Sequence, residues 1–254
     1  MAQKKDYNSN LVEFLRSFGA INFNKSNDYG KITGSEALAF PSMTISIQTK
    51  FTTTNNLVVF EKASDNTSVL CQTGNDFTKG GTASNSLDLR GRLLFSLGTS
   101  SGQALQSTQV GYTAVINDNN WHESVYVADS ASSVQRTFTD GDIASSVPMN
   151  TIPAANSNEW NVGARATGSI GYTGEMAELA VYDRAKSAGF IKKQKSLLKR
   201  YLQSRAEKPE GLVAYFPNTP IAVNDKDWTH EWTDVVYGYV MRIYNNPSIT
   251  SYSR

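Results

Sequence analysis

The most chemically suggestive stretch of the sequence spans residues 117–141, NDNNWHESVYVADSASSVQRTFTDG. It contains His122, one of only two histidines, directly after Trp121 and between Asp118 and Asp140 in the sequence. A histidine near carboxylates suits general acid–base catalysis, whereas an aromatic ring beside polar side chains suits ligand binding. The same pattern also fits a β-hairpin whose polar residues face water. All three alternatives follow from the residue types alone.

Catalysis is the least favoured of the three. A serine-histidine-aspartate arrangement would need His122 or His230 as its base, and the sequence has no G-x-S-x-G motif to hold a nucleophile. Glycosidases need two carboxylates on one side of the substrate, about 5–5.5 Å apart in retaining enzymes. The nearest pair, Glu175 and Glu178, is three positions apart, so a regular strand would point the two side chains to opposite faces. The sequence therefore predicts a protein that is not an enzyme.

Calcium is an open alternative as a cofactor. Asp28, Asp118 and Asp140 are predicted to lie in loops, and carboxylate oxygens are the ligands that Ca²⁺ prefers. Aspartates in loops more often form turns than bind metals, and no spacing here is diagnostic of a calcium site. No other cofactor is expected, because the sequence contains no phosphate-binding loop and no G-x-G-x-x-G motif.

Carbohydrate binding needs an aromatic platform with amide or carboxylate side chains around it. Aromatic residues of this kind are Trp121, Trp160, Tyr112 and Tyr172, although strand aromatics equally often pack in the core. The residues predicted to contact a ligand are Trp121, Asp140 and Tyr172.

The elements that must position these residues are predominantly β-strands. Short segments alternate between apolar and polar residues and are separated by turn clusters rich in Asn, Gly, Ser and Thr, which indicates a sandwich or barrel. The predicted strands cover residues 43–51, 57–62, 68–72, 93–98, 123–129, 160–164, 174–183, 211–217 and 235–246.

One helix is predicted at residues 187–204. Its apolar residues form one stripe at helical spacing, and lysines and arginines fill much of the remaining surface. A basic helix of this kind can bind membranes or nucleic acid, but a water-exposed outer face is the favoured interpretation. The net charge of the whole chain is +1, and no apolar run is long enough for a membrane span. Neither nucleic acid nor a membrane is therefore expected as a partner.

The order of the segments resembles the laminin-G-like jelly rolls of the concanavalin A-like lectin/glucanase class. An opening strand with an N-D-Y turn, a T-I-S-I strand, a W-H strand, a T-D-G turn and a closing G-E-M-A-E-L-A-V-Y-D strand follow in the family's order. The corresponding segments are residues 20–32, 43–51, 119–129, 138–141 and 160–187. The chain departs from the family at the helix start, where Phe190 stands in place of the capping-box glutamate and Ser187 must cap alone. The resemblance implies an all-β, antiparallel jelly-roll sandwich closed by one amphipathic helix.

Three regions are expected. Residues 1–19 form an N-terminal arm, residues 20–204 the jelly roll, and residues 205–254 an extended C-terminal segment. The C-terminal segment is rich in aromatic residues that it cannot bury by itself, so we expect it to pack on its own domain or on a neighbouring subunit. The residues predicted to mediate assembly are Trp228, Trp232, Tyr237 and Tyr239.

Proteins of this class include sugar binders, calcium-dependent adhesion modules, hydrolases and virion domains, so the fold does not decide the function. Such jelly rolls are usually displayed outside cells, yet the sequence starts without an apolar signal region and contains a single cysteine, Cys71. A phage virion protein, made in the host cytoplasm and displayed on a particle, reconciles these features. Its expected partners are other virion proteins, copies of itself and host-surface glycans. The alternatives are a bacterial carbohydrate-binding protein and, less favoured, a glycan hydrolase.

Overall fold

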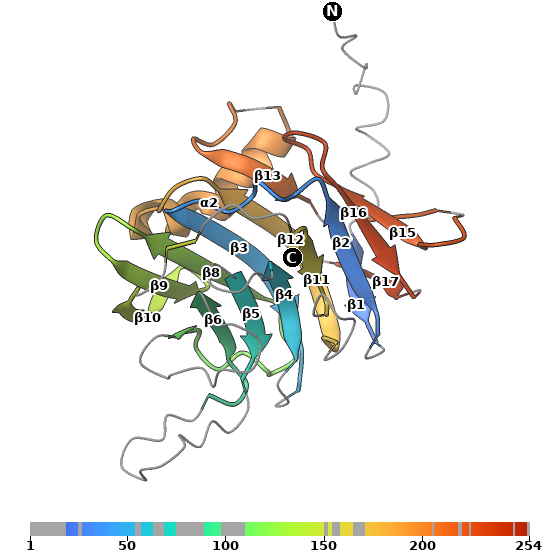
Figure 1. Ribbon diagram of the computed structural model, residues 1–254, viewed down its shortest axis with the longest axis horizontal. Helices are drawn as coiled ribbons and strands as arrows, with labels where there is room; N and C mark the ends of the chain where they lie inside the picture. Colours follow the sequence, from blue (N-terminus) through green and yellow to red (C-terminus); the bar gives the residue numbers. More distant parts are fainter. Residues whose placement is uncertain are drawn as a thin grey trace, which may run out of the picture.

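Two antiparallel sheets pack face to face across one hydrophobic core in the computed structural model (Figure 1). The structure describes residues 19–24, 27–53, 57–62, 69–74, 89–97, 110–149, 152–153, 158–164, 171–204, 206–217, 220–223, 225–245 and 247–252. The expected N-terminal arm lies outside the described residues, apart from Gly19. Over these ranges the architecture is the predicted jelly-roll sandwich with one helix.

The first sheet contains eight strands within the described ranges. They are β1 (Gly19–Phe23), β3 (Met43–Lys50), β8 (His122–Asp129), β9 (Val134–Thr139), β10 (Asp142–Pro148), β12 (Gly174–Tyr182), β13 (Leu212–Phe216) and β17 (Ser248–Ser251). Their order is β10-β9-β8-β3-β12-β1-β17, and β13 pairs with β12 beside β1.

The second sheet contains nine strands over the same described ranges. They are β2 (Tyr29–Thr33), β4 (Val58–Lys62), β5 (Val69–Thr73), β6 (Leu93–Leu97), β7 (Gly111–Tyr112), β11 (Trp160–Val162), β14 (Ile221–Ala222), β15 (His230–Thr233) and β16 (Val240–Tyr244). Their order is β14-β15-β16-β2-β11-β4-β5-β6-β7. Figure 1 shows β15 and β16 beside β2.

Alternation along the central strand β3 separates the core from the outer face of the first sheet. Met43, Ile45 and Ile47 point into the core between the sheets. Each such apolar side chain stabilises the fold by about 1.5–3 kcal/mol when it is fully buried. The intervening Ser46 and Gln48 therefore lie on the opposite, outer face, where they are available to a site.

The helix α2 (Ala188–Leu202) packs on this outer face. Its Ile191 packs with Val125 of β8 and Phe138 of β9. The helix begins as predicted, with Ser187 as its N-cap: the hydroxyl oxygen accepts a hydrogen bond from the Phe190 N–H at 3.3 Å. A single serine therefore starts the helix without a capping box.

The C-terminal segment is built into both sheets of its own chain. Strand β13 pairs with β12, β16 pairs with β2, and β17 pairs with β1. The expected boundary near residue 205 is therefore not a boundary in the sheets. These strands form hydrogen-bonded pairs with strands of their own chain. Packing on its own domain is one of the two arrangements expected for the segment.

The prediction of one strand over residues 235–246 is wrong for its first half, because the strand β16 begins only at Val240. A turn precedes β16, and the buried Asp234 organises it by accepting hydrogen bonds from the N–H groups of Val236, Tyr237 and Gly238. The same carboxylate accepts a hydrogen bond from the Tyr215 N–H in β13. An aspartate that satisfies successive N–H groups favours a turn over a continuous strand, whatever the β-propensity of the tyrosines and valines.

Strand β12 also departs from regular alternation. Its register with β3 shifts between Ala177 and Leu179, and Glu178 has a positive φ of 49°. A bulge of this kind puts two residues opposite one on the partner strand. The prediction that Glu175 and Glu178 point to opposite faces assumed a regular strand, and that assumption does not hold here.

Candidate functional site

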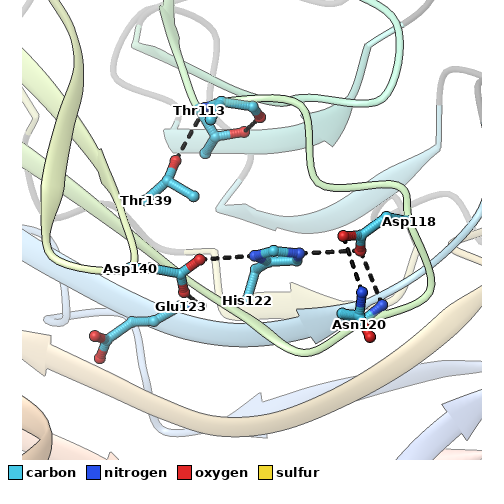
Figure 2. Close-up of polar contacts among 8 residues, drawn as sticks. Thr113, Asp118, Asn120, His122, Glu123, Thr139 and Asp140 are labelled. Atoms are coloured by element: carbon cyan, nitrogen blue, oxygen red, sulfur yellow. Dashed lines mark hydrogen bonds and ion pairs between the residues drawn. The ribbon is translucent and has the colours of Figure 1, made fainter.

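The 117–141 stretch forms a polar cluster around His122 at the start of β8 (Figure 2). The imidazole Nδ1 lies 2.7 Å from Asp140 Oδ2, and Nε2 lies 3.0 Å from Asp118 Oδ1. Ionised carboxylates can only accept hydrogen bonds, so both contacts are hydrogen bonds only when both ring nitrogens carry hydrogen. The geometry is therefore best satisfied by the imidazolium form of His122.

The charges in this cluster shift its acid–base equilibria. Burial lowers the pKa of His122, but the hydrogen bonds with Asp140 and Asp118 outweigh burial and raise it above the usual 6.5. Hydrogen bonds from the Asn120 side chain and backbone, followed by that from His122, lower the pKa of Asp118 to about 2. Both ring nitrogens of His122 thus face carboxylates, and the ring holds Asp118 and Asp140 on either side of it.

Asp140 connects this cluster to the outer face of the first sheet. It lies in the turn between β9 and β10 with a positive φ of 52°. Its Oδ1 accepts a hydrogen bond from the Glu123 N–H at 2.9 Å while Oδ2 faces His122. Thr139 beside it accepts a hydrogen bond from the Ala114 N–H at 2.9 Å, which joins the turn to the 113–120 loop. The Asp140 carboxylate is thus fixed from two directions.

A pocket of about 320 Å³ opens beside Asp140 on the outer face of the first sheet. The lining comes from β3, from β8 and the residue before it, from the β9–β10 turn, from one face of α2, and from the residue after β17. The lining residues are Gln48, Trp121, Glu123, Asp140, Gly141, Ile191, Lys192, Lys195 and Tyr252. Trp121 and Asp140, two of the three residues predicted to contact a ligand, therefore meet in one pocket.

The floor of the pocket is polar although it is buried. Gln48 is 3% exposed, and within the described part of the chain its Nε2 has no hydrogen-bond partner. Glu123 Oε1 accepts hydrogen bonds from Ser46 Oγ and from Gln194 Nε2, each at 3.2 Å. Buried amides are normally fully hydrogen-bonded, so an unsatisfied donor at a pocket floor is a candidate contact for a bound molecule.

The aromatic wall of the pocket comes from two distant parts of the sequence. The Trp121 and Tyr252 rings pack edge to face with centroids 4.6 Å apart and an interplanar angle of 85°. Tyr252 is 5% exposed, whereas Trp121 is only partly buried. Tyr252, directly after β17, therefore completes the pocket. Sequence patterns do not reveal this pairing, because the residues are 131 positions apart, 252 − 121.

Tyr172 does not belong to this site. It is fully buried in the core, where its ring packs against Phe23 and Phe51 with centroids 6.2 Å away in each case. The prediction that Tyr172 contacts a ligand is corrected by this position. The β-propensity of tyrosine made core packing an equally good interpretation, and core packing is what the structure has.

The three aspartates expected to bind calcium do not come together. No group of three or more His, Cys, Asp or Glu residues among those described is arranged to hold a metal ion. Asp28 is fully buried and accepts a hydrogen bond from the Asn24 N–H at 3.1 Å, as a turn aspartate does. Asp118 and Asp140 instead lie on either side of His122.

The four aromatic residues expected to mediate assembly have different environments. Trp232 is buried in the core of its own chain, packs against Phe216 and donates its indole N–H to the Pro217 carbonyl, so it does not face a neighbour. Trp228 stacks under the Arg242 guanidinium at 4.3 Å, and Tyr239 packs at the edge of the core. Tyr237 is the exposed member, at 66%.

Comparisons with known proteins define the class. Residues 24–192 match the Laminin_G_3 family, described as the concanavalin A-like lectin/glucanases superfamily, and the chain belongs to this family. No curated protein sequence matches the chain significantly. Among the described residues, no helix combines the length and apolar character needed to cross a membrane.

Two solved structures share the fold. One is a proposed carbohydrate-binding protein from Bacteroides ovatus ATCC 8483, which is 17% identical in sequence and has a TM-score of 0.64. The match covers 92% of this chain and 60% of that protein. This chain therefore spans less than two thirds of that relative. The heptameric SAP-like pentraxin from Limulus polyphemus is 15% identical with a TM-score of 0.51, over 92% of this chain and 98% of the pentraxin. At these identities the similarity shows the concanavalin A-like fold.

Proposed function

We propose that this protein is a non-catalytic carbohydrate-binding domain and that its ligand site is the outer-face pocket. The observation that carries the proposal is the meeting of an aromatic wall, Trp121 with Tyr252, and a buried amide donor, Gln48, in one small pocket. Sugar rings present apolar C–H faces and polar hydroxyls, so they suit such a combination of surfaces. Membership of a lectin/glucanase superfamily is consistent with the same function.

The arrangement of the carboxylates supports binding rather than hydrolysis. Glu123 and Asp140 both line the pocket, but hydrogen bonds from neighbouring protein groups occupy both Asp140 oxygens and Glu123 Oε1. A glycosidase needs one carboxyl that protonates the leaving group and a second that attacks or activates water. We therefore expect no release of reducing sugar from glycans that bind.

A glycan array tests the proposal. The wild-type protein is expected to bind a defined set of glycans, and Trp121→Ala to lose that binding by about tenfold or more, since one stacking aromatic contributes on the order of 1–2 kcal/mol. Trp228→Ala is the matched control, because it removes an indole outside the pocket lining. Binding that is lost equally in both variants, or never present in wild type, contradicts the proposal.

We further propose that the domain is displayed on a virion as a decoration or tail-associated subunit, which would bring copies of itself and other virion proteins as partners. Exposed apolar side chains of the C-terminal segment, Ile221 (56%) and Tyr237 (66%), support a docking role for this segment. Mass spectrometry of purified particles from the source would test this setting. Absence of the chain from the particles would contradict it without affecting the glycan-binding proposal.

A further inference from the structure

The charges around the pocket are balanced. Glu123 and Asp140 contribute two carboxylates, and Lys192 and Lys195 contribute two ammonium groups, all four lining the same pocket. Lys192 Nζ lies 3.2 Å from Asp142 Oδ1, and both side chains are largely exposed. An acidic sugar would bring a further carboxylate close to Glu123 and Asp140. The repulsion between the carboxylates and the loss of hydration both weaken binding, because the lining has no surplus of positive charge to offset them.

The pocket presents a buried donor, Gln48 Nε2, beside an acceptor, the Glu123 carboxylate. In the described structure, Gln48 Nε2 is a donor without a partner and Gln194 Oε1 is an acceptor without a partner, and the two residues are 3% and 0% exposed. Gln48 lines the pocket, whereas Gln194 lies outside its lining and donates a hydrogen bond to the lining residue Glu123 at 3.2 Å. Donation from Gln194 Nε2 to Glu123 Oε1 fixes the orientation of the Gln194 amide, because its oxygen in that position would face a carboxylate.

A hydroxyl group can pair with both this donor and this acceptor, and a carboxylate cannot. A sugar hydroxyl donates one hydrogen bond and accepts others, whereas an ionised carboxylate only accepts. A ligand carboxylate could accept from Gln48 but could not donate to Glu123, and a buried polar group left without a partner costs about 1–3 kcal/mol. The pocket volume of about 320 Å³ is near the small end of ligand sites, which suits one end of a glycan rather than a long chain.

We propose that the pocket selects a neutral, hydroxyl-rich terminal sugar over the corresponding acidic sugar. This inference rests on the proposed carbohydrate-binding function and specifies its ligand class. Trp121 and Tyr252 form the apolar wall, the amide of Gln48 donates to a ring hydroxyl, and Glu123 accepts from one. The balanced charge of the pocket makes binding only weakly dependent on ionic strength.

Paired ligands test the selection. Calorimetry on the full chain would compare gluco-, galacto-, manno- and xylo-trioses with hexose trioses whose non-reducing residue is the matching uronic acid. The neutral member of a hexose pair is expected to bind at least tenfold more tightly. Gln48→Met, which removes the amide at similar volume, should weaken neutral binding about fivefold to 100-fold, in line with the cost of one buried hydrogen bond.

The controls separate this inference from the proposed function. Gln203→Met changes a glutamine at the C-cap of α2, outside the pocket, and is expected to bind like wild type. If Gln48→Met fails to fold, Gln48→Glu retains the shape and replaces the donor with an acceptor, and it should lose neutral binding as well. Equal or tighter binding of the uronic acids, with loss on Trp121→Ala, overturns the neutral selection and leaves the carbohydrate site intact. No binding by either set contradicts the proposed function itself.

Discussion

The indole of Trp121 packs edge to face against the phenol ring of Tyr252, with the ring centroids 4.6 Å apart. This contact joins the start of β8 to the end of the chain, directly after the edge strand β17. It makes the C-terminal segment part of the proposed ligand site. The segment, predicted to pack on its own domain or on a neighbouring subunit, here packs on its own domain.

Tyr252→Ala should therefore affect both folding and binding. Loss of a nearly buried ring at the edge of the sandwich is expected to lower the free energy of unfolding by about 2 kcal/mol and to weaken glycan binding several-fold. Urea unfolding and calorimetry measure the two effects. Tyr237→Ala is the matched control, because this ring is 66% exposed and outside the pocket. Equal effects of the two substitutions would contradict the proposed role of Tyr252.

The pKa values of the two histidines should be shifted in opposite directions. Hydrogen bonds with Asp140 and Asp118 outweigh the effect of burial and raise the pKa of His122 above 6.5, while burial lowers the pKa of His230 below 6.5. A titration followed by NMR on the imidazole resonances measures both values. A pKa of His122 at or below that of His230 would contradict the described cluster.

The raised pKa also predicts how His122 contributes to stability. Protons bind more tightly to the folded state, so the contribution is fully present below the unfolded pKa of 6.5 and is lost as the pH rises through the higher folded value. The difference in the free energy of unfolding between wild type and His122→Gln should therefore fall from pH 6 to pH 8. If this difference in the free energy of unfolding instead grows from pH 6 to pH 8, folding lowers the pKa of His122, which contradicts the described cluster.

Asp234 is expected to be the most important carboxylate for the C-terminal strands. It accepts hydrogen bonds from four backbone N–H groups, those of Tyr215, Val236, Tyr237 and Gly238. Asp234→Ala should lower the free energy of unfolding by about 2–4 kcal/mol, since it leaves buried donors unsatisfied. Asp225→Ala, at an exposed turn aspartate, should cost less than about 1 kcal/mol. Urea denaturation that gives equal losses would contradict this assignment.

The helix that forms one wall of the pocket depends on its single cap. Ser187→Ala should lower the free energy of unfolding by about 1 kcal/mol, and Ser187→Asp should restore most of it. Ser196→Ala changes an exposed position within the same helix and is expected to be neutral or slightly stabilising. Thermal unfolding compares the three variants. A neutral Ser187→Ala would show that helix packing alone fixes the start of α2.

The sequence predicts the sandwich well because local patterns determine its central strands. Met43, Ile45 and Ile47 alternate with polar residues as a strand with one core face must, and the structure buries all three. The turn at Asp140 and Gly141 is equally local, since both residues have positive φ angles. Such features depend on neighbours in the sequence and are therefore accessible without a structure.

The pocket could be predicted only in part because it depends on distant contacts. Trp121 and Asp140 attract attention as an aromatic and a carboxylate in one short stretch. Gln48 does not, since a glutamine at a polar position of an alternating strand normally faces water. Tyr252 joins the pocket only because β17 pairs with β1, a long-range register that no local pattern specifies. Tyr172 lies in the core and not at the predicted site, because a strand tyrosine suits either a core or a surface.

The most direct test of the central claim is an NMR titration of the folded protein with the glycan that binds most tightly on the array. If the glycan binds in the pocket, the resonances of the Trp121 indole N–H and the Gln48 side-chain amide shift together, and both titration curves give the same Kd. The indole N–H resonances of Trp228 and Trp232, which lie outside the pocket lining, should stay unchanged. Saturable shifts at Trp228 or along the opposite sheet, with Trp121 and Gln48 unaffected, would place the ligand elsewhere and contradict the account.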